Sequence, residues 1–340
     1  MDSVTQVALG AAVGEAVMQN KVGRKAALWG AICGTLPDLD VLIPFGDPVS
    51  DFTFHRAESH SFFYMTLATP LIVWLITRIH PQAKEYRWRW GLLVWLALIT
   101  HALLDSFTVY GTQMFLPFSN FPVGWSTIFV IDPIYTLPLL IGTLSFFYLK
   151  HAPDLAYRLN IVGLILSTLY LAWSVGLQSH VSDLARESLQ KQNIHAKQLI
   201  TGPAPFNTLL WRTVVMTDSG YAEGFYSIMD EKDEILFTRY RSEDHLLEPL
   251  QDEWAVQRLQ WFSKGFYKVS RIEDDIIVSD LRMGVEPLYF FSFAVGKIGI
   301  DGIVAQEPRQ VEPPPIDMGA SMSRLWQRIW DEEILVMDVQ

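Results

Sequence analysis

Long apolar segments constrain the fold of this chain more than any other feature of its sequence. Residues 62–79, 128–149 and 159–177 each approach the length of a membrane-spanning helix and hold at most one charged side chain. Residues 90–107 are equally apolar apart from two ionisable side chains near their end. Because about 20 such residues cross the hydrocarbon core of a bilayer, the sequence predicts an α-helical membrane bundle of about four spans.

Two shorter apolar segments precede these spans, within residues 7–36, and a basic stretch separates them. Each segment carries two glycines four residues apart, Gly10 and Gly14 in the first and Gly30 and Gly34 in the second. Small residues at this spacing let two helices approach closely in lipid. The pattern predicts an N-terminal helical hairpin, and a soluble amphipathic hairpin lying on the membrane surface is the alternative.

The charge of the chain changes sharply after the last predicted span. Residues 177–340 hold 26 of the 37 acidic side chains and 16 of the 26 basic ones. Runs of β-branched and aromatic residues recur there between turn signals, which favours antiparallel strands, and an amphipathic helix is expected at 321–334. We therefore predict two domains: a membrane-embedded domain over residues 1–177 and a soluble acidic α+β domain, mainly antiparallel β, over residues 178–340.

Basic residues predict how the spans are oriented. Nine of the ten Lys and Arg side chains of residues 1–176 lie within 21–25, 78–89 and 150–158. Alternating spans place these three segments on one face, and basic loops are typical of the cytoplasmic face. The soluble domain is then expected outside the cytoplasm.

Two features exclude whole classes of function. Cys33 is the only cysteine, so the chain has neither an intramolecular disulfide nor a thiolate-based zinc site. The net charge is −11 and the basic residues are dispersed, whereas a nucleic-acid-binding protein typically shows a clustered basic surface.

Ionisable side chains gather at the ends of the predicted spans that face away from the basic segments. They come from distant parts of the sequence: Asp2, Asp38, Asp40, Asp47, Asp51, His55, Glu58, His60, His101, Asp105 and Asp132. An ionisable group inside a span costs roughly 2.5–3.5 kcal/mol on insertion scales, so it is normally paired and functional. The candidate site is therefore drawn from this set.

His101 and Asp105 form the sharpest motif, because a spacing of four residues places both side chains on one face of a helix. A simple hydrogen bond between them, without a ligand, is the alternative. Asp132 also fits an ordinary helix cap. Asp38 and Asp40 follow a proline and also fit a plain loop.

Imidazole and carboxylate groups without thiolate suit a zinc or manganese ion that activates water. We predict a divalent metal centre of one or two ions with these ligands: Asp38, Asp40, His55, His60, His101, Asp105 and Asp132. His55 and His60 are five residues apart, so a single helix would not direct both side chains to one point. The alternative to metal binding is that these residues form a polar cap at the start of the following span. Arg56 is a candidate for holding a phosphate, with a salt bridge to Asp51 or Glu58 as the alternative, and Glu58 is a candidate general base.

These motifs together resemble a known family. The segments are Asp2-Ser3-Val4-Thr5-Gln6, Gly34-Thr35-Leu36-Pro37-Asp38-Leu39-Asp40, His55-Arg56, Ser59-His60-Ser61 and His101-Ala102-Leu103-Leu104-Asp105. They resemble the YdjM-type inner-membrane metal-dependent hydrolases over about residues 1–175. The resemblance implies a hydrolase distantly similar to zinc-dependent phospholipase C, in which a His-x-x-x-Asp pair binds zinc. Members often have a histidine beside the early threonine, where this chain has Gln6, and an amide is a poor zinc ligand.

The sequence thus predicts a multi-pass protein of the bacterial inner membrane that hydrolyses phosphoester or other headgroup bonds of lipids at the outer face. Membrane lipids are its expected partners, nucleic acid is not, and a protein partner stays open. The alternative is a non-catalytic membrane protein with a structural metal that docks a partner through its soluble domain. A metal transporter ranks third, because polar residues do not continue through the cytoplasmic halves of the spans.

Overall fold

The structure is a computed structural model that describes residues 1–313, 315, 317–334 and 336. The chain forms two compact units. A helical unit comprises Met1–Ile43, His55–Val175 and Pro205–Asn207, and a sheet unit comprises Pro44–Phe54, Gly176–Ala204 and Thr208–Gln340. The predicted boundary between residues 1–177 and 178–340 thus has two exceptions: Pro44–Phe54 belongs to the sheet unit and Pro205–Asn207 to the helical unit. Residues 337–340 of the second predicted domain lie outside the described residues.

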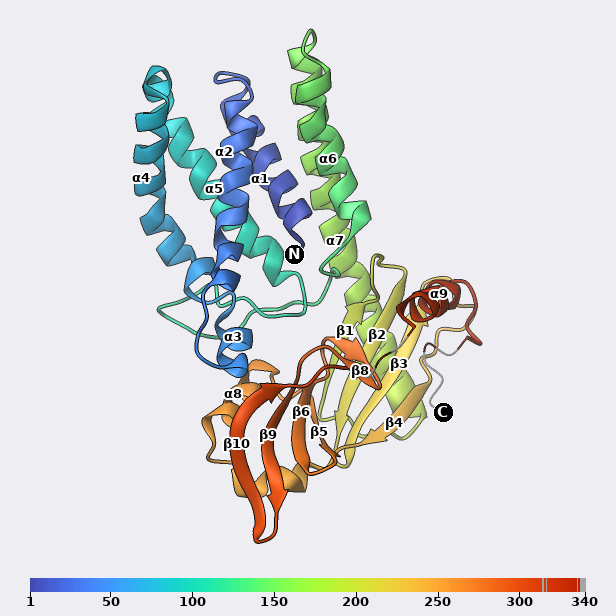
Figure 1. Cartoon of the computed structure of the whole chain (residues 1–340). Coiled ribbons are helices and arrows are strands. Elements are labelled where there is room, and N and C mark those ends of the chain that lie inside the picture. Colours follow the sequence, from blue (N-terminus) through green and yellow to red (C-terminus); the bar gives the residue numbers. More distant parts are fainter. Residues whose placement is uncertain (314, 316, 335, 337–340) are drawn as a thin grey trace. The chain divides into compact units, whose positions relative to one another are not determined.

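The helical unit is a bundle whose connections α1–α2, α4–α5 and α6–α7 lie at one end (Figure 1). Its helices are α1 (Ser3–Met18), α2 (Lys25–Thr35), α4 (Phe62–Ile79), α5 (Arg87–Ser106), α6 (Pro133–Tyr148) and the first part of α7 (Pro153–Lys191). Short 3-10 helices lie between them: η1 (Leu36–Leu42), η2 (Glu58–His60) and η3 (Pro81–Tyr86).

Helices α1 and α2 form a hairpin in which the two backbones touch. A Cβ on Gly10 would lie 2.2 Å from the carbonyl oxygen of Gly30, and a Cβ on Gly34 would lie 2.5 Å from the carbonyl oxygen of Gln6. Only glycine allows this approach, as small residues at a four-residue spacing do in helix pairs generally. The side chain of Asp2 caps α1 by accepting from the backbone N–H groups of Val4 and Thr5.

The prediction of about four spans is wrong. Among the described residues, two helices are long and apolar enough to cross a membrane, α4 and α7. Helix α6 starts only at Pro133, where Asp132 caps it, so it has 16 residues rather than the 22 of the apolar segment 128–149. Helix α5 has 20 residues, but Arg87, Arg89, His101 and Asp105 make it too polar to qualify.

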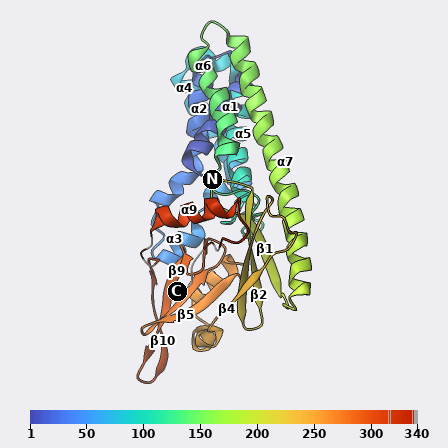
Figure 2. The same ribbon diagram turned by 90° about the vertical axis from the view of Figure 1, so that its right-hand side faces the viewer.

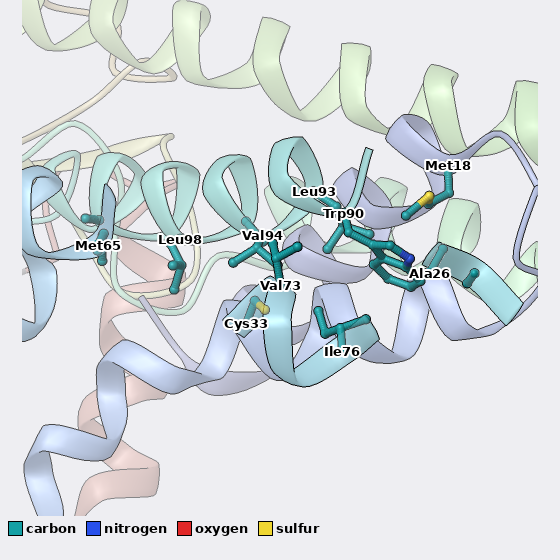
Figure 3. Packing of buried hydrophobic residues seen from close by; sticks show 13 residues of the cluster. Met18, Ala26, Cys33, Met65, Val73, Ile76, Trp90, Leu93, Val94 and Leu98 are labelled. Carbon is teal, nitrogen blue, oxygen red and sulfur yellow. The ribbon is translucent and has the colours of Figure 1, made fainter. Parts of the chain in front are cut away.

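The core of the helical unit lies where α5 packs on α2 and α4 (Figure 3). Trp90 is fully buried at one end of this core, close to Met18 and Ala26. Further along α5, Leu93, Val94 and Leu98 continue the same buried face. Apolar packing therefore holds α5 against α2 and α4, the helices on either side of the segment that carries the candidate residues 38–60.

The sheet unit contains two four-stranded antiparallel sheets and a two-stranded ribbon. The first sheet has the order β1 (Gln198–Pro203), β2 (Leu210–Thr217), β3 (Gly220–Ser227), β4 (Phe237–Arg241). The second has the order β10 (Gly302–Gln310), β9 (Ser292–Gly299), β6 (Asp275–Asp280), β5 (Tyr267–Ile272). The ribbon pairs β7 (Gly284–Val285) with β8 (Leu288–Tyr289). The antiparallel pairing agrees with the prediction, although the strands divide between sheets.

Helices cover parts of these sheets. The last turns of α7 lie beside β1 and β2 (Figure 2), where Val181 and Ala185 pack with Trp211 and Tyr226. The other helices of this unit are α3 (Pro48–Phe54), η4 (Asp244–Leu250), α8 (Trp254–Phe262) and α9 (Met318–Arg328). Helix α9 overlaps the final amphipathic helix that the sequence predicts at 321–334: it begins three residues before Ser321 and ends six residues before Ile334.

Candidate metal centre

Four side chains of the helical unit meet at one point. Asp38 comes from η1, His60 ends η2, and His101 and Asp105 lie one turn apart near the end of α5. One ligand atom from each lies within 4.8 Å of all the others. We call this group the Asp–His cluster. Among the described residues it is the one group found that could hold a metal ion, and it offers ligands for a single ion.

The atoms that face one another are ring nitrogens and carboxylate oxygens. His60 Nε2 lies 3.1 Å from both His101 Nε2 and Asp105 Oδ2. Asp38 Oδ1 lies 3.4 Å from each of the two Nε2 atoms. Two imidazoles and two carboxylates at this separation are a donor set that suits zinc or manganese.

Hydrogen bonds on the far side of each imidazole fix which nitrogen faces the cluster. His101 Nδ1 lies 2.7 Å from the carbonyl oxygen of Gly34, which can only accept, so Nδ1 carries the proton. Ser59 Oγ donates to Asp40 Oδ2 at 2.5 Å and therefore accepts from His60 Nδ1 at 2.8 Å. Both Nε2 atoms are left with a free lone pair, as metal-ligating histidines require.

Asp40 and His55, both predicted as ligands, form a pair next to the cluster. Asp40 Oδ1 lies 2.7 Å from His55 Nδ1, and its other oxygen accepts from the backbone N–H of Arg56 at 3.0 Å and from Ser59. The carboxylate therefore orients the neighbouring His60 through Ser59. His55 stays partly exposed, with its ring centre 6.1 Å from that of His60.

Asp132 and Glu58 lie elsewhere. The carboxylate of Asp132 accepts from the backbone N–H groups of Ile134 and Tyr135 and from the hydroxyl of Tyr170, which matches the helix-cap alternative. Glu58 opens η2 with an exposed side chain. Neither belongs to the Asp–His cluster.

Arg56 is buried behind Asp105 rather than paired with Asp51 or Glu58. Its Nη2 lies 3.4 Å from Asp105 Oδ1, its Nη1 donates to Thr108 at 3.3 Å, and its guanidinium stacks over the ring of Tyr110. Its Nε has no hydrogen-bond partner among the described residues. The backbone of Arg56 adopts the left-handed conformation, with φ 63°, and this turns its side chain toward the interior of the protein.

Asp105 uses its two oxygens for different partners. Oδ2 faces the histidines, while Oδ1 contacts the amino group of Met1 and accepts from Gln6 Nε2 at 3.1 Å. Gln6 therefore holds Asp105 in place through the oxygen that does not face the histidines. The Oε1 atom of Gln6 is itself buried without a hydrogen-bond partner in the described part of the chain. Sequence motifs did not reveal the contributions of Ser59 and of the Gly34 carbonyl, because both depend on where the loops pack.

The electrostatics of the two loop carboxylates follow from these contacts. Burial alone would raise the pKa of Asp38, but the neighbouring imidazoles of His101 and His60 outweigh it and hold that pKa well below its usual range. For Asp40, the His55 and Ser59 hydrogen bonds likewise outweigh burial and lower its pKa. Both side chains are therefore carboxylates at neutral pH, which is the form that binds a cation.

Comparison with known proteins agrees with the motif resemblance. The family model described as YdjM inner membrane protein matches residues 1–181, which includes every residue of the cluster. The chain is also 29% identical over 168 residues to Uncharacterized protein YfhP of Bacillus subtilis (strain 168), covering 46% of this chain and 49% of that relative. It thus spans about half the length of the curated relative it matches. No solved structure matches, and the distant similarity to zinc-dependent phospholipase C is not confirmed. The chain belongs to the YdjM family of inner membrane proteins.

Proposed function

We propose that the protein is a membrane-bound, metal-dependent hydrolase that cleaves phosphoester bonds in lipid headgroups. The observation that supports this most is the convergence of two imidazole nitrogens and two carboxylate oxygens in the Asp–His cluster. The side chains of His60, His101 and Asp105 are 0% exposed and that of Asp38 is 19% exposed, so solvent and substrate reach the cluster past Asp38.

A zinc or manganese ion held by Asp38, His60, His101 and Asp105 would supply Lewis-acid polarisation and an acidified water. Arg56 is the candidate for binding a phosphate oxygen, because its Nε lies buried beside Asp105 and has no hydrogen-bond partner among the described residues. A planar guanidinium is well suited to phosphate, since it presents several donors in a fixed plane.

His55 is better placed than Glu58, the general base expected from the sequence, to carry a proton during the reaction. Its bond to Asp40 fixes the ring and leaves Nε2 free, which is the arrangement of an oriented general base or acid. The side chain is 21% exposed, so a substrate can reach it. Glu58 is exposed and stays a second candidate.

Aromatic side chains near the cluster support a lipid substrate. The segment between α5 and α6 carries exposed Phe115, Phe118, Phe121 and Trp125. Exposed aromatics at this density are typical of the interface between headgroups and hydrocarbon. The headgroup of a lipid could thus reach the cluster while the acyl chains of that lipid stay in apolar surroundings.

A structural metal site is the second candidate. It is favoured by the complete burial of three of the four cluster side chains, since structural zinc sites are closed whereas catalytic ones keep an open position. In this case the protein would bind metal without turnover and would act by docking a partner.

Metal content and hydrolysis of the purified full chain distinguish these functions. We expect one zinc or manganese ion per chain and release of phosphate or headgroup from phospholipids or phosphodiesters. His101→Ala and Asp105→Ala should each lose both the ion and the activity. His55→Ala should keep the ion but lower turnover by about 10²–10⁴-fold. Full metal occupancy in both His101→Ala and Asp105→Ala would reject the metal centre, and a loaded but inactive wild type would favour the structural role.

A further inference from the structure

An apolar cavity of about 360 Å³ lies in the helical unit beside the first turns of α4. Its walls are Phe63 and Leu67 of α4 and the 114–118 segment, including Met114 and Phe118. Its volume falls within the range of roughly 300–1,000 Å³ that is usual for small-molecule sites. The cavity is therefore large enough for a ligand of its own.

The chemistry of the walls selects an apolar occupant. Thr66 is the one polar side chain among the described residues that line the cavity. Its hydroxyl already donates to the carbonyl of Phe62 at 2.7 Å and accepts from Trp95 Nε1 at 3.0 Å. The lining thus offers no free polar group to a sugar, phosphate or peptide.

Backbone hydrogen bonds attach this cavity directly to the site. The N–H of Gln113 donates to the carbonyl of Arg56 at 2.9 Å, and the N–H of Phe62 donates to the carbonyl of Met114 at 3.0 Å. Ser61, next to the cluster residue His60, donates to the carbonyl of Leu116 at 2.5 Å. The same short segments therefore carry the phosphate-binding candidate, a cluster ligand and the cavity walls.

The cavity also continues the exposed apolar face of α4. Leu67 is 62% exposed, and one turn on, Leu71 is 67% exposed, followed by Trp74 at 56%. Because α4 is one of the two described helices long and apolar enough to cross a membrane, in a family of inner membrane proteins, its exposed apolar face is suited to contact with lipid tails. A tail can pass from that face into the cavity without crossing water.

We propose that the cavity binds one acyl chain of the substrate lipid while its phosphate group lies at the Asp–His cluster. This inference rests on the proposed function and assigns a binding place to an acyl chain of its lipid substrate. Phe118, which is 82% exposed and packs edge-on against Phe63 with ring centres 5.6 Å apart, forms the rim over the chain.

Photocrosslinking in lipid nanodiscs tests the cavity. The full-length protein is placed in nanodiscs containing a small fraction of a phospholipid with a photoreactive group on its acyl chain, and labelled peptides are identified by mass spectrometry. We expect labelling concentrated in residues 62–67 and 114–118. Leu67→Trp, which fills the cavity, and Phe118→Ala, which removes its rim, should each lower that labelling at least fivefold. Leu71→Trp, the same substitution one turn along the same exposed face, should leave it unchanged.

Even labelling along α4, or an equal loss in Leu71→Trp, would overturn the cavity as a lipid site, because ordinary surrounding lipid behaves in that way. His101→Ala separates this result from the proposed function. Labelling that persists in His101→Ala while its metal and activity are lost supports both ideas. Specific labelling in a wild type that hydrolyses no phospholipid upholds the cavity and overturns the hydrolysis.

Discussion

Asp38 and Asp40 lie two residues apart in η1, but their side chains have different partners. Asp38 Oδ1 faces the two Nε2 atoms of the cluster, whereas Asp40 accepts from His55, Ser59 and the backbone of Arg56. The tight turn of a 3-10 helix, about three residues per turn, separates their directions. One residue is therefore a ligand candidate and the other supports the ligands.

This difference predicts unequal effects on metal binding. Asp38→Ala removes a donor atom, so we expect no ion to be retained after purification. Asp40→Asn leaves all four donors but weakens the support of His60, so the affinity should fall by about 10–100-fold at unchanged stoichiometry. Competition with a chelator of known affinity measures both. Equal losses in the two variants would contradict the assigned roles.

Lys264, after α8 in the sheet unit, predicts a pH dependence of stability. Burial and then the charge of Arg282 lower the pKa of Lys264 to about 8, against an ordinary value of 10.5. Between these values the unfolded chain binds the proton more tightly than the folded chain, so stability rises with pH, by at most about 1.4 kcal/mol per unit.

The midpoint of thermal unfolding of the full chain should accordingly rise between pH 8 and pH 10. In Lys264→Met, which keeps a long side chain at the same left-handed position (φ 56°), this rise should be absent. The comparison stops at pH 10, just below the ordinary lysine pKa of 10.5, because above that value the folded and unfolded chains both lose the proton. A rise of the same size in both proteins would show that another group is responsible.

At the scale of elements, the α1–α2 hairpin positions part of the site. Its close approach places Gln6 against Asp105 and the carbonyl of Gly34 against His101 Nδ1. A Cβ on Gly30 would lie 2.1 Å from the carbonyl oxygen of Gly10, so the backbones could not keep their separation. Helix packing and ligand orientation are therefore coupled.

We expect Gly30→Ala to destabilise the protein by about 1–3 kcal/mol and to weaken metal binding as well. Gly91→Ala is the matched control, because no described atom outside its immediate surroundings lies within 4 Å of its Cβ position. As alanine favours a helix by about 0.8–1 kcal/mol over glycine, this control should be neutral or stabilising. Thermal unfolding and metal titration of both variants, in the same detergent, give the comparison. A destabilised Gly91→Ala would mean that glycine loss, rather than backbone contact, sets the effect.

At the scale of the whole molecule, the two candidate spans and the basic residues predict an orientation. The connections α1–α2, α4–α5 and α6–α7 lie at one end of the bundle (Figure 1), and nine of the ten Lys and Arg side chains of residues 1–176 lie in these connections or in the helix turns next to them. Basic residues favour the cytoplasmic side, so we propose that the chain after α7 lies outside the cytoplasm.

Single cysteines in the full chain test this orientation, in a background where the buried Cys33 is replaced by alanine. Gln82→Cys is expected to react with a membrane-impermeant thiol reagent only after lysis. His195→Cys, at a side chain 83% exposed, should react in intact spheroplasts. Reaction of both positions under the same condition would contradict the predicted orientation.

The sequence by itself determined the features that depend on near neighbours or on chemical type. The spacing of His101 and Asp105 put both on one face of α5, the glycine pairs indicated the close hairpin, and alternating strand and turn signals indicated antiparallel sheets. The choice of nitrogen and oxygen donors without thiolate also follows from composition alone. These inferences hold because helix and strand geometry repeat over a few residues.

Only the tertiary structure decided which ionisable groups meet. His60 enters the cluster while His55 turns to Asp40, Arg56 is turned inward by its left-handed backbone, and Asp132 caps α6. The number of candidate spans was likewise decided by where the helices start and how polar the residues inside them are, not by the length of an apolar segment alone. The physical reason is the same throughout: the direction of a side chain in a loop or 3-10 turn depends on contacts with residues distant in the sequence, and no local spacing encodes those contacts.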